Sequence, residues 1–369
     1  NMIRFRSLSK SARTGITSYS IILLAFAILF PLQNLGIINH SISGQLVPIC
    51  TYIVMALSLN LTVGFLGELS LGHAGFVSVG AFTGVIAASS LQDKVSPDPL
   101  RLVIAIIIGG IFAGIVGLLI GIPVLRLRGD YLAIVTLAFG EIIKNIINCL
   151  YVGVDKKGLH FSMTDIKSLG MENGRVILNG PQGAVGIEQI ASFTAGIILI
   201  LFTLFVILNL VNSKAGRAVM AIRDNRIAAE SVGISITKYK LTAFITSAVL
   251  AGMAGALYAM NYSTIAAKKF DFNTSILILV FVVLGGMGNI VGTIISTVIL
   301  YMLPELLREF SDYRMLIYAI ILILVMLVTN NARIKLIRAN ASAAIMSWFR
   351  KAMSHTKNQP KGKEDTHNG

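Results

Sequence analysis

The sequence predicts an all-α membrane protein, a polytopic bundle of about ten spanning helices, some short or broken, with both termini in the cytoplasm. Three observations support this fold class. Hydrophobic residues make up 55% of the 369-residue chain and charged residues only 13%, whereas a soluble domain carries about 25% charged residues. The apolar residues form long runs rather than alternating with period two, so the runs satisfy their backbone groups as helices. Lys and Arg gather in a few segments between the runs.

The apolar runs define the individual spans, because a spanning helix needs about 20 mostly apolar residues. Runs of this kind lie at 17–33, 46–66, 70–90, 102–125, 131–150, 190–211, 238–262, 273–303 and 314–330. The run 273–303 is long and contains the sequence Gly285-Gly286-Met287-Gly288. We predict that it forms two short crossings broken at these glycines. Short halves are acceptable where they are buried in protein.

The basic residues predict the orientation, because Lys and Arg collect on the cytoplasmic side of a membrane. Four lie in the amino-terminal tail, two in the turn 126–130, six in 212–240 and eight after residue 330, together 20 of the 31 in the chain. Ten crossings from a cytoplasmic N-terminus place all four segments inside. Nine crossings would place the basic tail outside, and this is the less favoured alternative.

Residues 1–338 are therefore expected to form the transmembrane domain. The tail 339–369 is polar, Lys-rich and cytoplasmic, and we expect it to be disordered beyond about residue 352. The long outer loop 152–188 balances four basic with four acidic residues. It contains Asn179-Gly180-Pro181-Gln182-Gly183, a composition typical of a tight turn.

Several function classes are excluded by what the sequence contains. The net charge of +14 is explained by the cytoplasmic basic residues, so no nucleic-acid partner is expected. Cys50 and Cys149 lie in apolar runs and give no disulfide framework, and the five histidines show no metal-ligand spacing. No stretch reads G-x-x-x-x-G-K-[ST] or forms a nucleophile elbow. We therefore predict no catalytic residues, no metal and no cofactor, and an external source of energy for any uphill transport.

The segment 217–234, RAVMAIRDNRIAAESVGI, is unusual because a loop between two spans needs only a few residues. Asp224 or Asn225 is a suitable helix N-cap and Gly233 a suitable C′ residue, which predicts a helix of about eight residues. Such a helix is unstable alone and must pack against something. Its small face would consist of Ala228, Ala229 and Val232. The residues alone leave two interpretations open: a loop folded back on the span ends, or a docking helix for a soluble partner.

Four stretches carry a resemblance to a known family. Ala228-Ala229-x-x-x-Gly233 is similar to the EAA loop of permeases in ABC importers, although Ile227 stands where that motif begins with Glu. The wider region 216–259, together with GFLGELSLGHAGFVSVGAF (64–82), LRLRGDYLAIVTLAFGEII (125–143) and VVLGGMGNIVGT (282–293), resembles one branch of these permeases. That branch is the permease of branched-chain amino acid importers, and within it the M-type subunit.

The resemblance implies that the chain is half of a permease pair in a bacterial or archaeal cytoplasmic (inner) membrane. A second, similar permease would complete the pair. Two ATP-binding subunits would dock on the cytoplasmic side, and a periplasmic or lipoprotein substrate-binding protein would deliver leucine, isoleucine or valine to the outer surface, where it could touch the loop 152–188. The chain itself would be no enzyme. The residues expected to couple it to the ATPases are Arg217, Arg223, Asp224, Asn225, Arg226, Ala228, Ala229, Glu230 and Gly233.

A second group of residues is predicted to line the translocation pathway. Apart from Phe76, its members are polar or break a helix within apolar surroundings: Glu68, Ser70, His73, Phe76, Glu141, Gly285, Gly286 and Gly288. Polar groups inside a membrane mark pathways or helix caps, and Ser70 could cap the span that follows it. For Glu141 a structural ion pair with Lys144, one turn away, is favoured over a substrate contact. The glycine break could aim a helix N-terminus at a carboxylate, although a packing kink is the simpler interpretation.

Other functions remain open at this point. A related importer for urea or short amides shares much of the pattern. A secondary transporter or channel would need no ATPase, and its transport would survive deletion of the segment 217–234. A membrane-embedded enzyme would need several converging catalytic side chains, which His73 alone does not supply.

Overall fold

The computed structural model describes residues 10–36, 40–92, 95–127, 129–155, 158–171, 174–308 and 313–330. The chain divides into two compact units, Asn1–Met302 and Leu303–Gly369. The first unit contains every contact discussed below. The second contains the helix α13 (Arg314–Asn330). The predicted boundary between residues 338 and 339, and the tail beyond it, lie outside the described residues.

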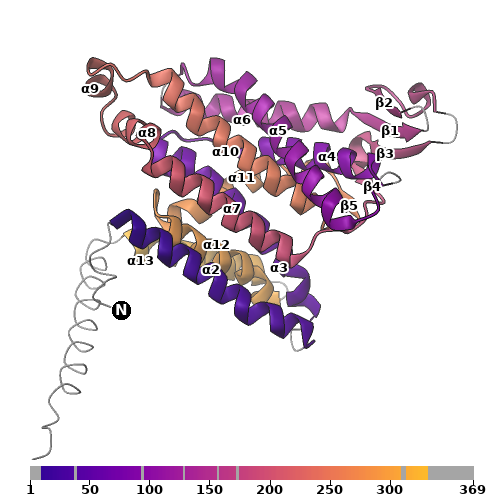
Figure 1. Ribbon diagram of the computed structural model, residues 1–369, viewed down its shortest axis with the longest axis horizontal. Helices are drawn as coiled ribbons and strands as arrows, with labels where there is room; N and C mark the ends of the chain where they lie inside the picture. The colour runs from indigo at the N-terminus through magenta and orange to yellow at the C-terminus, as the bar shows by residue number, and fades with distance from the viewer. Residues whose placement is uncertain are drawn as a thin grey trace, which may run out of the picture. The chain divides into compact units, whose positions relative to one another are not determined.

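Helices dominate the first unit (Figure 1). They are α2 (Lys10–Asn34), α3 (His40–Asn60), α4 (His73–Ser90), α5 (Asp98–Val124), α6 (Asp130–Asn148), α7 (Phe193–Asn212), α8 (Lys214–Asp224), α9 (Arg226–Ser231), α10 (Ile236–Ala259), α11 (Phe272–Gly285) and α12 (Ile290–Leu306), whose last four residues belong to the second unit. Short helical turns are η1 (Leu61–Leu66), η2 (Lys167–Leu169), η3 (Gly180–Gln182) and η4 (Ala267–Lys269).

Six of the described helices are long and apolar enough to cross a membrane. They are Gly15–Gln33, Ile42–Leu66, His73–Ser90, Asp98–Val124, Phe193–Asn212 and Ile236–Ala259. Each coincides with a predicted span. The predicted span 131–150 is also a helix, α6, although it is not one of the six and carries the charged residues Glu141 and Lys144. The predicted double crossing in 273–303 is a pair of shorter helices, α11 and α12, interrupted after Gly285.

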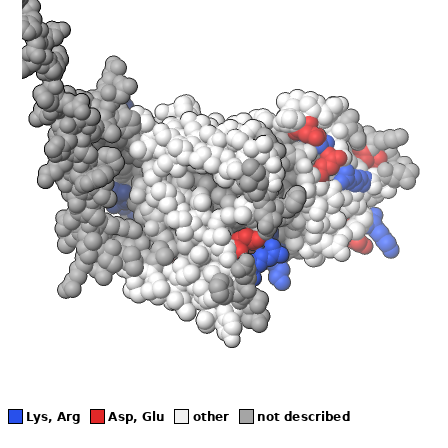
Figure 2. All heavy atoms as spheres, turned by 90° about the horizontal axis from the view of Figure 1, so that it is seen from below, with Lys and Arg blue, Asp and Glu red and all other residues white. Residues whose placement is uncertain are grey.

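The core of the first unit is built around α10, which packs against α3, α4 and α5. The helices approach closely because small residues line their contacts. A Cβ added to Gly80 of α4 would lie 2.1 Å from the carbonyl oxygen of Gly252 in α10. Outward-facing side chains of α5, by contrast, are large, apolar and exposed. Most of the described helical surface visible in Figure 2 carries no charged residue, as expected for helices whose solvent is lipid.

A small antiparallel sheet is formed by four strands between α6 and α7 and a fifth strand after α10, and the sequence prediction missed it. Its strands are β1 (Tyr151–Asp155), β2 (Gly158–Ser162), β3 (Arg175–Asn179), β4 (Ala184–Val185) and β5 (Thr264–Ile265), in the spatial order β2-β1-β3-β4-β5. The prediction of an entirely helical protein is therefore wrong for this region. The predicted tight turn is confirmed, because the Asn179 N–H donates to the Gly183 carbonyl oxygen (2.8 Å) across η3.

The sheet and the pair α8–α9 mark opposite ends of the bundle (Figure 1). Helix α7 runs from the sheet to α8, and α10 returns from α9 to β5. The sheet is fastened to the helices by Arg101 of α5, which is buried and contacts the carboxylates of Asp98 and Glu188. Glu188 also accepts a hydrogen bond from Gln92, which in turn accepts one from Arg175 of β3 (2.6 Å). This network joins α4, α5 and the sheet.

We predict that Glu188→Ala loosens the sheet from the helices, because it leaves the buried guanidinium of Arg101 with Asp98 as its remaining carboxylate. The loss should be about 1–2 kcal/mol, since Glu188 is itself about half exposed. A lowered midpoint of thermal unfolding in detergent would show it. Glu188→Gln, which keeps an acceptor, should lose less, and equal midpoints for wild type and both variants would contradict the prediction.

Candidate functional site

The pair α8–α9 corresponds to the segment that the sequence singled out. Ser213 caps α8, because its hydroxyl accepts from the Gly216 N–H (3.1 Å). Asn225 separates the two helices and caps α9 by accepting from the Ala228 N–H (3.0 Å). Gly233 follows α9 with φ +83°, a left-handed conformation that favours glycine. The predicted caps Asn225 and Gly233 are confirmed, but α9 has six residues rather than about eight.

The two faces of α9 have different partners. Ala229 is only 4% exposed and packs with Ile222 of α8 and Ile236 of α10. Ile227 and Val232 are 81% and 74% exposed, and Ala228 is also exposed. The predicted small face is therefore split, with Ala229 turned inward and Ala228 and Val232 outward. Both interpretations of the segment are compatible with this arrangement: the inner face folds back on the bundle, and the outer face is an apolar surface without a partner in this chain.

The charged residues of the segment are mostly exposed, but one of them, Arg223, also contacts the bundle. Arg217, Arg223 and Glu230 are exposed and Arg226 is half-buried. Arg223 binds the Asp224 carboxylate (2.9 Å). Its Nη1 also donates to the backbone carbonyl oxygen of Gly64 (3.0 Å). This contact joins α8 to η1, which lies 159 positions earlier in the chain.

The segment that contains Gly64 departs from a regular α-helix. Helix α3 ends at Asn60, continues as the π-helical turn η1, and is followed by an irregular segment, residues 67–72, before α4 begins at His73. A π-helical turn is rare, and the carbonyl groups of the last turn of a helix have no partner within that helix. Arg223 therefore supplies a charged donor to a carbonyl group at the end of a helix.

Glu68 follows η1 and forms an ion pair with Lys240 of α10. The two side chains are 15% and 4% exposed, so the pair is almost completely enclosed. Enclosed charges are tolerated when they are paired. The structure thus gives this predicted pathway residue a partner within the bundle, and it ties η1 to the first turns of α10.

His73, Phe76 and Ser70 lie in the packed interior. The Nε2 atom of His73 lies 2.9 Å from the hydroxyl of Ser58 in α3, and Phe76 makes an edge-to-face contact with Phe244 of α10. Ser70 is buried, and its hydroxyl has no hydrogen-bond partner among the described residues. The N-cap position of α4 is Gly72, so the prediction that Ser70 caps this helix is wrong.

The predicted ion pair between Glu141 and Lys144 on α6 is confirmed. It satisfies two charges on an otherwise apolar helix within a single turn, as expected for residues three apart. A role of Glu141 in the pathway stays a prediction.

The break between α11 and α12 is closed by protein groups. The Gly286 N–H donates to the Val283 carbonyl oxygen (3.1 Å) and the Asn289 N–H to that of Gly286 (2.9 Å). The Gly288 N–H donates to the side-chain oxygen of Asn60 (2.8 Å). Gly285, the last residue of α11, packs closely against Gly292 of α12. Asn60 was missed by the sequence analysis, although an amide at the end of an apolar run was a usable signal.

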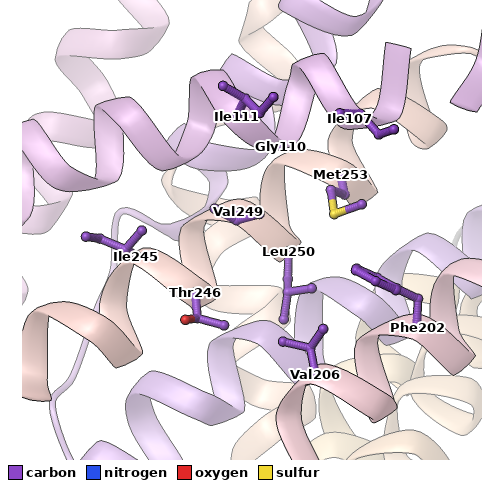
Figure 3. Close-up of a pocket in the computed structure, with 10 residues that line it drawn as sticks. All are labelled: Ile107, Gly110, Ile111, Phe202, Val206, Ile245, Thr246, Val249, Leu250 and Met253. Carbon is purple, nitrogen blue, oxygen red and sulfur yellow. The ribbon is translucent and has the colours of Figure 1, made fainter. Parts of the chain in front are cut away.

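A cavity of about 370 Å³ lies between α5, α7 and α10. Figure 3 shows the residues that line it, Ile107, Gly110, Ile111, Phe202, Val206, Ile245, Thr246, Val249, Leu250 and Met253. The one hydroxyl of this lining, on Thr246, donates to the Thr242 carbonyl oxygen (2.8 Å). The cavity therefore offers no charge or free donor that would recognise a charged solute, and it is separate from the predicted pathway residues.

A family model described as the permease component of branched-chain amino acid transport systems matches residues 41–326. The chain belongs to this family. Together with six helices long and apolar enough to cross a membrane, this membership indicates a multi-pass membrane protein. The matched residues include η1, the pair α8–α9 and the α11–α12 break. All the contacts described above among these elements therefore lie within the matched region.

Known relatives of this permease carry related names. It is 35% identical to the high-affinity branched-chain amino acid transport permease LivM of Escherichia coli, over 75% of this chain and 66% of that protein. It is 25% identical to a probable branched-chain amino acid permease LivM of Methanocaldococcus jannaschii, over 71% and 79%. It is 23% identical to the fructose import permease FruG of Bifidobacterium longum, over 70% and 72%. The chain thus spans just under two thirds of the length of the E. coli relative. No solved structure matches it.

We predict that Gly64→Ala distorts the contact between η1 and the α11–α12 break. A Cβ at this position would lie 2.2 Å from the Gly288 nitrogen and 2.0 Å from the Asn60 side-chain oxygen, closer than packed atoms allow. The variant should lose about 1–3 kcal/mol of stability, measured as a lower unfolding midpoint. Gly44→Ala on the same helix is the control, because nothing lies within 4 Å of its added Cβ. Equal midpoints for the two variants would refute the close approach.

Removal of one partner from the enclosed ion pair should destabilise the permease more than removal of both. Lys240→Met leaves the Glu68 carboxylate without its cation, which costs about 3 kcal/mol in a buried setting. The double variant Lys240→Met/Glu68→Leu removes both charges and should recover much of that loss. Thermal unfolding of the three proteins in detergent tests this, and a double variant that is less stable than Lys240→Met would argue against it.

Proposed function

We propose that this permease is one half of the translocation pathway of an ATP-driven importer for leucine, isoleucine and valine. The observation that carries the proposal is the pair α8–α9. Its inner face is packed on the bundle, and its outer face presents Ile227 and Val232 at the end opposite the sheet. A fixed helix pair with an uncovered apolar face suits a docking site for a separate ATPase. The similarity to permeases named for branched-chain amino acids in a bacterium and an archaeon supports the solute class.

The proposed topology has ten crossings, with both termini in the cytoplasm. Helices α11 and α12 are counted as two short crossings, and the pair α8–α9 lies inside. The sheet then lies outside, where a periplasmic or lipoprotein substrate-binding protein would deliver the solute. The basic residues of 212–240 support this orientation.

In this mechanism nucleotide-driven closure of two ATPase subunits displaces α8–α9. The spans of this chain and of a second, similar permease are then reoriented, so that a solute site between them faces alternate sides of the membrane. The chain makes and breaks no covalent bond. Ile227 and Val232 would enter an apolar groove of the ATPase, and the nearby charges Arg226 and Glu230 would orient the contact.

Transport by the reconstituted complex tests the function. Proteoliposomes that contain both permeases and both ATPases, supplied with the binding protein, should accumulate leucine in an ATP-dependent way. Isoleucine and valine should compete with leucine, whereas urea and fructose should not. Competition by urea would favour the short-amide importer, and competition by fructose a sugar importer. Uptake that continues without ATP would indicate a secondary transporter or channel.

We predict that Ile227→Asp and Val232→Asp abolish ATPase binding while leaving the fold intact, because both side chains point away from the bundle. The amount of ATPase that co-purifies with the permease should fall at least about tenfold, as for residues central to an interface, at an unchanged unfolding midpoint. Met163→Asp is the matched control, since Met163 is 67% exposed but follows β2 at the opposite end. Normal ATPase binding by both α9 variants would contradict the proposal that α9 is the docking site for the ATPase.

A further inference from the structure

Two contacts from distant parts of the chain meet on the turn η1. From one side, Arg223 of α8 donates to the Gly64 carbonyl oxygen (3.0 Å). From the other side, the α11–α12 break approaches the same glycine so closely that a Cβ there would lie 2.2 Å from the Gly288 nitrogen. Helix α8 and the break are thus joined through a single residue of η1, although neither is close to it in sequence.

Asn60, the last residue of α3, holds the second of these contacts. Its side-chain oxygen accepts from the Gly288 N–H (2.8 Å), and its amide nitrogen donates to the Thr293 hydroxyl (3.0 Å). The residue is 1% exposed. The buried side-chain amide of Asn60 therefore forms hydrogen bonds with both the break and the first turn of α12. Buried side chains with two such bonds fix the relative position of the segments they join.

We propose that Asn60 and Arg223 are positioning residues that transmit the displacement of α8–α9 through η1 to the α11–α12 break. This inference rests on the proposed ATP-driven function. Helix α8 is also packed on η1 through the cluster of Leu66, Val219 and Ala243. A shift of α8 therefore moves η1 or breaks these contacts, and the Asn60 amide carries the movement on to α12.

The turn η1 is suited to this task because its hydrogen bonding is not that of a regular helix. The Thr62 carbonyl oxygen accepts from both Gly67 and Glu68 (3.1 Å for Glu68), so one acceptor serves two donors at its end. Single π-helical turns inside helices are rare and are frequently found at functional sites. Packed elements with two discrete arrangements convert small displacements into helix movements.

The test compares transport with ATP hydrolysis in the reconstituted complex. Asn60→Leu keeps the approximate volume of the side chain and removes both hydrogen bonds, and it is too deeply buried to touch an ATPase. We expect it to reduce solute moved per ATP hydrolysed at least about tenfold, the scale of a lost buried hydrogen-bond partner. ATPase co-purification and hydrolysis rate should stay at wild-type values. Arg223→Gln should reduce the same ratio.

A double-mutant cycle shows whether Asn60 and Arg223 act together through η1 or affect transport independently. If both residues act through η1, the double variant Asn60→Leu/Arg223→Gln should transport no less per ATP than the worse single variant, because residues in one network are not additive. Multiplied losses would overturn the proposal. An unchanged ratio in Asn60→Leu would also overturn it.

Two further variants keep the result interpretable. Thr293→Val removes the acceptor of the Asn60 amide and leaves the Gly288 contact, so it should reduce the ratio in the same direction but less. If Asn60→Leu fails to assemble, Thr293→Val takes its place in the test. An unchanged amount of solute moved per ATP in Thr293→Val would then contradict the proposed transmission through Asn60.

Thr51→Val is the matched control, because the buried Thr51 hydroxyl donates only to its own helix at Pro48 (2.7 Å). If the wild-type complex itself shows no ATP-dependent uptake, the proposed function fails, and the link is then overturned with it.

Discussion

The structure depends on one constraint: a backbone N–H or C=O group shielded from water must find a partner within the protein. Regular spanning helices satisfy it internally. The bundle departs from regular helix at η1, at residues 67–72 and at 286–289. At two of these places a polar side chain closes the gap, Arg223 on the Gly64 carbonyl and Asn60 on the Gly288 N–H. The irregular segments and the polar residues near them are therefore one feature, and they join α8 through η1 to the α11–α12 break.

Much of the helical fold follows from local sequence. Apolar run length predicts the six long helices, because lipid requires a minimum length of apolar helix. Glycine composition predicts the interruption after Gly285, and cap chemistry predicts Asn225 and Gly233 as the limits of α9. The sheet was not predictable in the same way. Its strands are two to five residues long, and β5 pairs with β4 from 79 residues away in sequence at Val185 and Thr264, so no local periodicity marks it.

Contacts between segments account for what sequence reasoning missed in the candidate site. The small face of α9 looked uniform, yet only Ala229 turns inward, because Ile222 and Ile236 happen to lie on that side. Glu68 looked like an isolated carboxylate near a membrane turn, and its cation, Lys240, comes from 172 residues later. Caps and nearby ion pairs such as Glu141–Lys144 are local and could be predicted. The contacts of Asn60 and Arg223 depend on tertiary packing and could not be predicted.

The distribution of polar groups suggests how the permease combines rigidity with movement. The contact between α4 and α10 is formed by small residues at backbone distance, and such contacts resist sliding because a dense interior has little free space. The end that carries α8–α9 also contains apolar clusters and the close approach of Gly64 to Gly288, but its elements are joined in addition by side-chain hydrogen bonds and by the Glu68–Lys240 pair. Such directional contacts can exchange partners without opening a cavity. A force applied to the uncovered face of α9 would therefore act first on the part of the bundle with exchangeable contacts, and the close-packed helices would move as a body behind it.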